Sequence, residues 1–260
     1  ALRGMLGTRQ TVITVTSSGT GILEAAIRSA VRERLLVVVS GFFGDYLARI
    51  AESSGKEVVR VTVPPGKTVE PDQLAALLDG PRIDAVALVH SESSPGSLAP
   101  LEKLAPVVRS KPDVLLLVDA ISSAGGVPIE MDRLGIDFVA TGSQKALALP
   151  PGLAFGAASD RLLQRASAIP DAGYYFNVPR LVGLASRYQA FETPALSLYL
   201  ALICQLRRIA EEGGWPARWG RHAEMASRFQ AWADGVAGAK LLAEPGRRTP
   251  TVSALQLTAG

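Results

Sequence analysis

The chain has 260 residues, of which 48% are hydrophobic and 20% charged, a balance typical of a globular protein with a buried core. Its formal net charge is only +3, and its arginines form no basic stripe with interleaved aromatic residues, which disfavours nucleic-acid binding. A single cysteine, Cys204, excludes an intrachain disulfide and a cysteine metal cluster, and two histidines are too few for a histidine-rich metal site.

Strands and helices alternate along the first 160 residues. The predicted strands are continuous apolar or β-branched runs, at residues 11–16, 35–39, 57–63, 85–90, 114–119, 138–141 and 153–158. The predicted helices between them carry apolar residues at helical spacing, at residues 21–32, 45–53, 70–78 and 101–109. Such an alternation predicts an α/β fold, in which helices cover both faces of a parallel sheet.

Beyond residue 160 the pattern becomes helical. Residues 197–211 and 219–235 predict long amphipathic helices, and Cys204 falls in an apolar run of the first, so we expect a buried, inert thiol. We divide the chain into a large domain, residues 1–195, and a second segment, residues 196–260, with connecting helices and the beginning of a smaller domain. The alternating residues near the C-terminus predict a strand with no partner after it.

Two charged residues form the centre of the predicted site. Asp119 ends an apolar strand, and Lys145 follows 26 positions later in a turn of small residues. A buried carboxylate is unfavourable unless a cation pairs with it, and the protonated ring nitrogen of pyridoxal phosphate is such a cation. A lysine can carry the same cofactor as a Schiff base. Taken singly, however, most aspartates at strand ends cap turns and most lysines are solvated.

Three further strand ends carry polar or aromatic residues. In an open α/β sheet the carboxyl ends of the strands meet at one edge, where ligands bind. Residues 18–20, Ser-Gly-Thr, precede a helix and suit either a phosphate or an ordinary cap. Residues 42–43 are two phenylalanines between glycines, and one ring could stack on a planar cofactor or plug the loop. Residues 91–94, Ser-Glu-Ser-Ser, fit a site loop or a polar turn.

Five segments, in order and over nearly the whole chain, resemble class V aminotransferases. They are residues 17–26, 41–45, 90–96, 118–123 and 142–152. The resemblance is closest to the alanine–glyoxylate and serine–pyruvate branch, to which the Ser-Gln-Lys-Ala-Leu run before Pro-Pro-Gly is specific. It implies the large domain of fold type I pyridoxal phosphate enzymes, with a mostly parallel, seven-stranded sheet, plus the start of a small C-terminal domain.

The resemblance also implies a role for each site residue. Lys145 would bond pyridoxal 5'-phosphate and shuttle a proton, and Asp119 would pair with the pyridine nitrogen. The remaining implied contacts are Ser18, Gly19, Thr20 and Gln144 at the phosphate, Phe43 and Ile121 on the ring faces, Ser93 near the 3'-oxygen, and Thr193 at the neighbouring subunit's phosphate. Such a composite site implies a homodimer.

The implied reaction transfers an amino group from L-alanine or L-serine to glyoxylate or pyruvate. Within the fold, the alternatives are 2-aminoethylphosphonate or ureidoglycine aminotransferases and a cysteine desulfurase or lyase, which the apolar setting of Cys204 disfavours. A degenerate, non-catalytic fragment and a nucleotide-binding Rossmann protein are further alternatives. The first strand-end turn has neither a Walker motif nor a G-x-G-x-x-G motif, which disfavours the Rossmann protein.

The chain departs from the family at both ends. Family members carry an N-terminal segment with a Gly-Pro turn and a C-terminal domain with an arginine that binds the substrate carboxylate. We therefore expect a fragment truncated at both ends, which bonds the cofactor but transaminates poorly. No apolar run approaches membrane-spanning length, and the first residues lack the apolar stretch of a secretory signal, so we expect a cytoplasmic protein.

Overall fold

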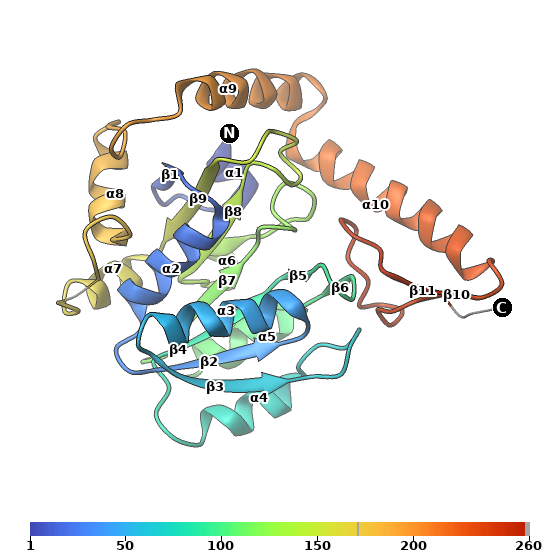
Figure 1. Cartoon of the computed structure of the whole chain (residues 1–260), viewed down its shortest axis with the longest axis horizontal. Helices are drawn as coiled ribbons and strands as arrows, with labels where there is room; N and C mark the ends of the chain where they lie inside the picture. Colours follow the sequence, from blue (N-terminus) through green and yellow to red (C-terminus); the bar gives the residue numbers. More distant parts are fainter. Residues whose placement is uncertain (171, 258–260) are drawn as a thin grey trace.

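The computed structural model describes residues 1–170 and 172–257. Its centre is a seven-stranded sheet in the order β1-β9-β8-β7-β4-β2-β3 (Figure 1). The strands are β1 (Val12–Thr16), β2 (Arg34–Val39), β3 (Glu57–Thr62), β4 (Ala85–Val89), β7 (Leu115–Asp119), β8 (Phe138–Gly142) and β9 (Leu153–Ala158). β9 is antiparallel to β1 and β8, and the other pairs are parallel. The predicted α/β fold with a mostly parallel sheet is confirmed.

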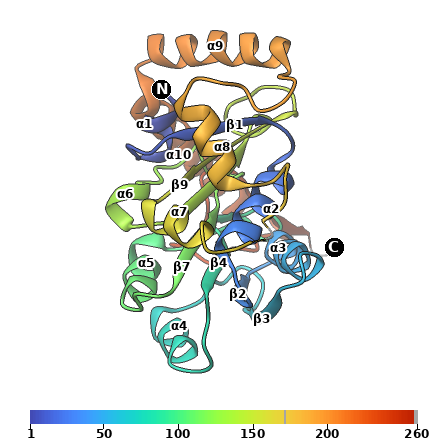
Figure 2. The same ribbon diagram turned by 90° about the vertical axis from the view of Figure 1, so that its left-hand side faces the viewer.

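Helices cover both faces of this sheet, as Figure 2 shows. The helices are α1 (Leu2–Leu6), α2 (Gly19–Ala30), α3 (Phe42–Ser53), α4 (Pro71–Leu78), α5 (Leu101–Arg109), α6 (Met131–Leu134), α7 (Asp160–Ala166), α8 (Val178–Ser186), α9 (Leu196–Glu211) and α10 (Gly214–Asp234). Successive strand residues point to opposite faces, so Leu36 and Val38 pack toward α4 and α5, whereas Leu35 and Val37 pack toward α2 and α3. Burial of both faces accounts for the continuous apolar strands in the sequence.

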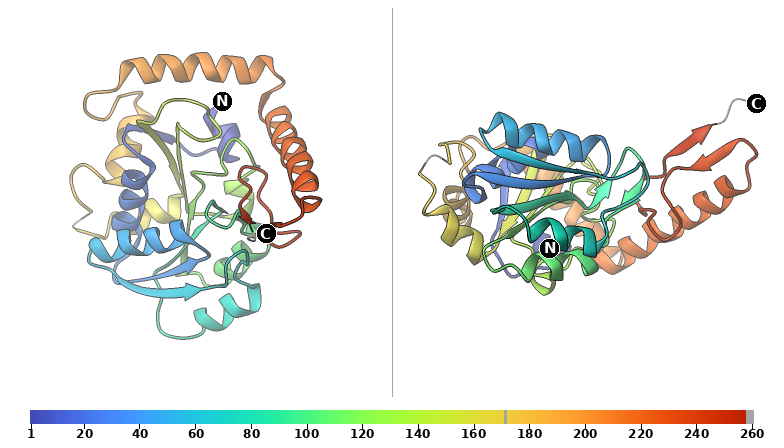
Figure 3. Two further views of the ribbon diagram at one scale, coloured as in Figure 1. Left: turned by 45° about the vertical axis from the view of Figure 1, so that its right-hand side comes forward. Right: turned by 90° about the horizontal axis from the view of Figure 1, so that it is seen from below.

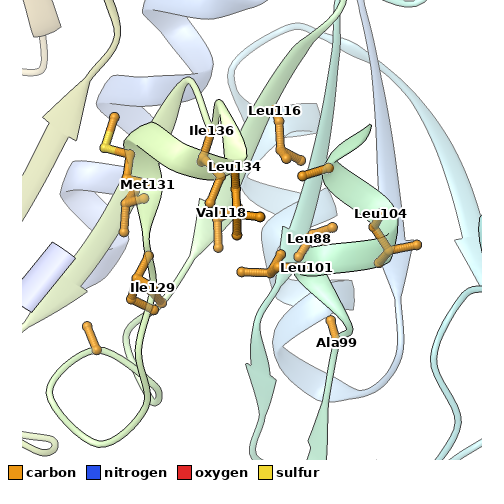
Figure 4. Close-up of a cluster of buried hydrophobic side chains, with 14 of the residues drawn as sticks. Leu88, Ala99, Leu101, Leu104, Leu116, Val118, Ile129, Met131, Leu134 and Ile136 are labelled. Carbon is orange, nitrogen blue, oxygen red and sulfur yellow. The ribbon is translucent and has the colours of Figure 1, made fainter. Parts of the chain in front are cut away.

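The core on the α5 side is built largely from branched aliphatic residues (Figure 4). Leu88, Leu116 and Val118 of the sheet meet Leu104 of α5 and Leu134 of α6 there, and each is at most 7% exposed. Burying an aliphatic side chain of this kind stabilises the fold by about 1.5–3 kcal/mol. This packing fixes the strands whose carboxyl ends form the candidate site.

The C-terminal segment extends from the sheet domain (Figure 3). α9 and α10 contribute Leu202, Ile209 and Trp215 to the core, so they are packed against the large domain. Two short strands, β10 (Ala239–Leu241) and β11 (Leu255–Leu257), form an antiparallel pair. The strand predicted near the C-terminus therefore has a partner, which precedes it in the chain.

Three further local predictions differ from the structure. The chain begins with α1, whose Met5 and Leu6 are buried, where the sequence predicted no element before the strand at residues 11–16. α10 begins at Gly214, five residues before its predicted start. Cys204 is exposed on α9, so the prediction of a buried thiol was wrong: in an amphipathic helix, it lies on the face away from Leu202.

No helix within the described residues is both long and apolar enough to cross a membrane.

Candidate active site

A cavity of about 220 Å³ lies where the carboxyl ends of β1, β2, β4, β7 and β8 meet. It is lined by Ser18, Gly19, Thr20, Leu23, Phe43, Tyr46, Val89, Ser91, Asp119, Ile121, Ser122, Gln144 and Lys145. Eight of the ten residues that the sequence indicated are among them, and Ser93 and Thr193 are not. The convergence follows from the parallel strands, since their carboxyl ends lie at one edge of the sheet.

Asp119 is the last residue of β7 and forms the buried wall of the cavity, with 5% of its surface exposed. Its Oδ1 accepts a hydrogen bond from the backbone N–H of Ile121 at 2.9 Å. Burial raises the pKa of Asp119 to about 7; the nearby Glu92 carboxylate adds to the rise, whereas the Ile121 amide and Lys145 oppose it. Such a carboxylate would be stabilised by a cationic partner in the cavity.

Lys145 lies on the turn between β8 and β9, on a different strand end from Asp119. Its Nζ is 5.8 Å from the centroid of the Phe43 ring. The turn is closed by hydrogen bonds from Ala148 N to the Lys145 carbonyl at 2.8 Å and from Ser143 Oγ to the Pro150 carbonyl at 2.7 Å. The amine thus reaches the same cavity as the Asp119 carboxyl group.

The N-terminus of α2 forms another wall of the cavity. Ser18 is its N-cap residue, and among the described residues no hydrogen bond caps the helix through the Ser18 side chain. A Cβ on Gly19 would come within 2.3 Å of Ile121 Cδ1, so any other residue at this position would displace the Ile121 side chain from its place in the cavity wall. The free N–H groups and the helix dipole favour an anion at this end.

The Phe43 ring is fixed by a cap on helix α3. The buried Glu92 carboxylate accepts hydrogen bonds from Phe43 N at 3.3 Å and from Gly44 N at 2.8 Å, and Ser94 Oγ accepts one from Phe42 N at 2.9 Å. A carboxylate at a helix N-terminus is stabilised by these donors and by the helix dipole. Glu92 therefore fixes the first turn of α3, which carries the Phe43 ring of the cavity.

Several residues of the cavity were missed in the sequence. Tyr46 follows Phe43 by three positions, so the helical period could have identified it. Ser122 also lines the cavity and lies next in the chain to Ile121. Ser91 belongs to the segment that the sequence assigned to a site loop or a polar turn; it lines the cavity, and its Oγ donates to Thr249 Oγ1 at 2.8 Å. That contact spans 158 positions, and no local pattern predicts it.

Two predicted residues lie outside the cavity wall. Ser93 reaches it through a hydrogen bond of 2.8 Å between its Oγ and that of Ser122. Thr193 is exposed in the loop before α9, and its predicted contact with a neighbouring subunit stays a prediction.

The chemistry of the cavity fits pyridoxal phosphate. A carboxylate that requires a cation, a lysine amine, an aromatic ring and a helix N-terminus match the ring nitrogen, aldehyde, ring face and phosphate of this cofactor. No group of three or more His, Cys, Asp or Glu residues that could hold a metal ion occurs within the described part of the chain.

Comparison with known proteins gives the family. The model of the aminotransferase class-V family matches residues 1–259, and the chain belongs to this family. It is 32% identical to an uncharacterized aminotransferase of Methanocaldococcus jannaschii, over 100% of this chain and 68% of that protein. A crystal structure of alanine–glyoxylate aminotransferase from Nostoc sp. superposes with a TM-score of 0.92 and 30% identity, over 100% of this chain and 70% of that one.

The relatives' names differ in function. The chain is 32% identical to a soluble hydrogenase small subunit of Synechococcus sp., over 79% of this chain and 55% of that protein. Other relatives are named as 2-aminoethylphosphonate–pyruvate and ureidoglycine–glyoxylate aminotransferases. The chain spans 55% and 68% of the lengths of the first two curated relatives.

Proposed function

We propose that this chain is the cofactor-binding part of a pyridoxal 5'-phosphate-dependent aminotransferase that moves an amino group from L-alanine or L-serine to glyoxylate or pyruvate. The observation that carries the proposal is the pairing, in one cavity, of the buried Asp119 carboxyl group with the Lys145 amine. Membership of the class-V aminotransferase family supports the reaction type.

When bound, the cofactor supplies an electron-withdrawing ring that stabilises negative charge at the substrate α-carbon. Asp119 would hold a proton at the ring nitrogen, because burial makes its ionised form dependent on a cationic neighbour. Lys145 would hold the cofactor covalently when substrate is absent, and its Nζ, once free, would take a proton from the substrate α-carbon. Both roles of Lys145 require its amine to reach the cavity that Asp119 lines, and Lys145 lines the same cavity.

The remaining cavity residues orient the cofactor. Phe43 and Ile121 would hold the ring plane from its two sides, and Ser93 would act through Ser122 near the 3'-oxygen. The phosphate would bind the N-terminus of α2 through Ser18, Gly19 and Thr20, with Gln144 beside it. Thr193 would reach the phosphate of a second copy of the chain, so the proposal includes a homodimer. It also includes a cytoplasmic location and a boundary between the large domain and the second segment after residue 195.

The proposed substrates are inferred from the names of similar proteins. Alanine–glyoxylate aminotransferase of Callithrix jacchus is 30% identical to the chain over 257 residues, and the Nostoc structure carries the same name. The desulfurase alternative needs a nucleophilic cysteine at the cofactor. Cys204 lies on α9 and does not belong to the cavity wall, which favours transamination.

A spectral titration tests this function. We expect pyridoxal 5'-phosphate to give the purified chain a visible absorbance band, and L-alanine or L-serine to discharge that band as the amino group moves to the cofactor. Lys145→Ala should lose the original band. A band that is unchanged by Lys145→Ala would contradict the assignment, and discharge by 2-aminoethylphosphonate in place of alanine and serine would replace the proposed substrates.

A further inference from the structure

The turn that carries Lys145 is held from outside by two side chains of distant helices. Arg218 of α10 donates from Nε to the Ala146 carbonyl at 3.0 Å, and its Nη2 contacts the same oxygen. Gln205 of α9 donates from Nε2 to the Leu147 carbonyl at 2.9 Å. These are the two carbonyl groups that directly follow Lys145 in the chain.

The turn requires such support, because its backbone is strained. Ala148 has a φ of 54°, in the left-handed region that a non-glycine residue adopts at a cost of about 1–2 kcal/mol. Irregular connections between strands are usually the mobile parts of a domain. Donors fixed on packed helices limit that mobility at the residues next to Lys145.

Arg218 is in an unfavourable place for a charge. Its side chain is only 7% exposed, desolvation lowers its pKa, and the Glu212 carboxylate is 3.9 Å away. The guanidinium group is thus directed at a neutral backbone oxygen more closely than at an anion. Leu147 is buried in the same core cluster as Trp215 of α10, so the turn and the helix form one packed unit.

Resting on the proposed function, we propose that Arg218 and Gln205 are positioning residues that hold the Lys145 turn against α9 and α10. They keep the amine directed into the cavity, where Nζ adds to the cofactor aldehyde and one water is released. Without them the cavity still binds the ring and phosphate, but the lysine bonds the aldehyde slowly. Neither residue lines the cavity wall.

Two ligands separate positioning from general damage. Pyridoxal 5'-phosphate reports attachment to Lys145, measured by quenching with borohydride at set times and mass spectrometry of the Lys145 peptide. Pyridoxine 5'-phosphate has an alcohol in place of the aldehyde and reports binding of ring and phosphate alone, measured by calorimetry. The test variants are Arg218→Leu, Arg218→Lys and Gln205→Leu. Arg221→Leu is the matched control, since Arg221 lies on the same helix and pairs with the same Glu212 at 3.2 Å.

We expect Arg218→Leu and Gln205→Leu to slow attachment at least about tenfold, while pyridoxine 5'-phosphate affinity changes less than about threefold; a tenfold change corresponds to 1.4 kcal/mol. Arg218→Lys should recover part of the rate, because an ammonium donor can still reach the carbonyl. Arg221→Leu should attach the cofactor at the wild-type rate. If Arg218→Leu does not fold, Gln205→Leu decides the outcome, because it also removes a donor to the Lys145 turn.

Wild-type attachment rates in Arg218→Leu and Gln205→Leu would overturn the positioning role and leave the proposed function intact. A parallel loss of both ligands in these variants would also overturn it, because the residues would then support the whole cavity. Failure of the wild-type chain to attach pyridoxal 5'-phosphate at Lys145 would overturn the proposed function, and this inference with it.

Discussion

Two buried aspartates at opposite ends of the sheet have very different surroundings. Asp84 precedes β4 at the amino edge, and its Oδ2 accepts hydrogen bonds from the backbone N–H groups of residues 32, 33 and 34 at 2.7–3.1 Å. Asp119 ends β7 at the carboxyl edge and, within the described residues, accepts one protein hydrogen bond, from Ile121. Both aspartates are 5% exposed, so burial alone does not distinguish them.

The difference distinguishes a structural carboxylate, Asp84, from a candidate ligand-binding one, Asp119. The backbone donors around Asp84 satisfy its charge in the folded chain, so the residue ties the start of β2 to that of β4. Asp119 retains acceptor capacity that faces a cavity, and its raised pKa reflects that incomplete compensation. A buried acid whose charge the fold leaves unmatched is a candidate ligand site.

The largest expected effect is on the pH dependence of stability without cofactor. The folded-state pKa of Asp119, about 7, lies above its value of 3.8 in the unfolded chain, so this group lowers stability as pH rises between these values. Asp119→Asn should remove this pH-dependent loss of stability. Its free energy of unfolding should exceed that of wild type by an amount that grows to about 4 kcal/mol above pH 7. The measurement is urea unfolding of both proteins from pH 4 to 8.

The stability of wild type and of Asp119→Asn is compared at each pH because His90 also changes the stability of both proteins with pH. Burial lowers the pKa of His90 to about 4, so its contribution to stability grows as pH rises from 4 to 6.5, against the trend from Asp119. The difference between wild type and Asp119→Asn cancels the histidine contribution. Parallel curves for the two proteins would show that Asp119 is ionised in the folded chain at all these pH values.

The second effect is on cofactor affinity. Asp119→Asn should weaken pyridoxal 5'-phosphate binding at least about a hundredfold, because the buried pair with the ring nitrogen is worth about 3 kcal/mol or more. Equilibrium titration of the visible absorbance band measures the affinity. Binding within threefold of wild type would show that Asp119 does not contact the cofactor, and the comparison with Asp84 would lose its meaning.

The third effect comes from the matched change at the other edge of the sheet. Asp84→Asn should lower the free energy of unfolding by about 2 kcal/mol, since three charge-assisted hydrogen bonds become neutral ones. Its cofactor affinity should stay within about threefold of wild type. Thermal unfolding combined with the same titration checks both. A loss of affinity without a loss of stability would reverse the roles assigned to the two aspartates.

The smallest effect concerns the cap that fixes Phe43. Glu92→Gln should destabilise the chain by about 1 kcal/mol, because one acceptor oxygen is lost from the N-terminus of α3. Glu52→Gln on the same helix is the control and should change stability by less than about 0.5 kcal/mol, since that carboxylate is 47% exposed in its pair with Arg60. Equal urea midpoints for the two variants would contradict the capping role.

Much of the site could be predicted because it follows the order of the strands. Asp119, Lys145, Phe43 and the Ser-Gly-Thr turn each follow an apolar run, and parallel strands bring such positions to one edge. The antiparallel direction of β9 could not be predicted, because a buried strand has the same apolar run in either direction. Short elements such as α1 and β10 contain too few residues for a periodic pattern.

Contacts that depend on tertiary packing were the ones missed. Gln205 and Arg218 lie 58 and 72 positions after the turn residues that they contact, and a single polar residue on a helix has no local signal for a partner so distant. The exposure of Cys204 depends on which face of α9 packs on the core, which Leu202 and Ile209 determine in the folded chain. Local patterns thus predict residues that line the cavity, but not the residues of distant helices that hydrogen-bond the Lys145 turn.

The most direct test of the central claim is the position at which the chain attaches its cofactor. After incubation with pyridoxal 5'-phosphate and reduction with borohydride, we predict that peptide mass spectrometry finds the modification on Lys145 at close to one per chain, and that Asp119→Asn lowers this occupancy at limiting cofactor. A modification spread over the exposed lysines, or its absence from the Lys145 peptide, would contradict the account.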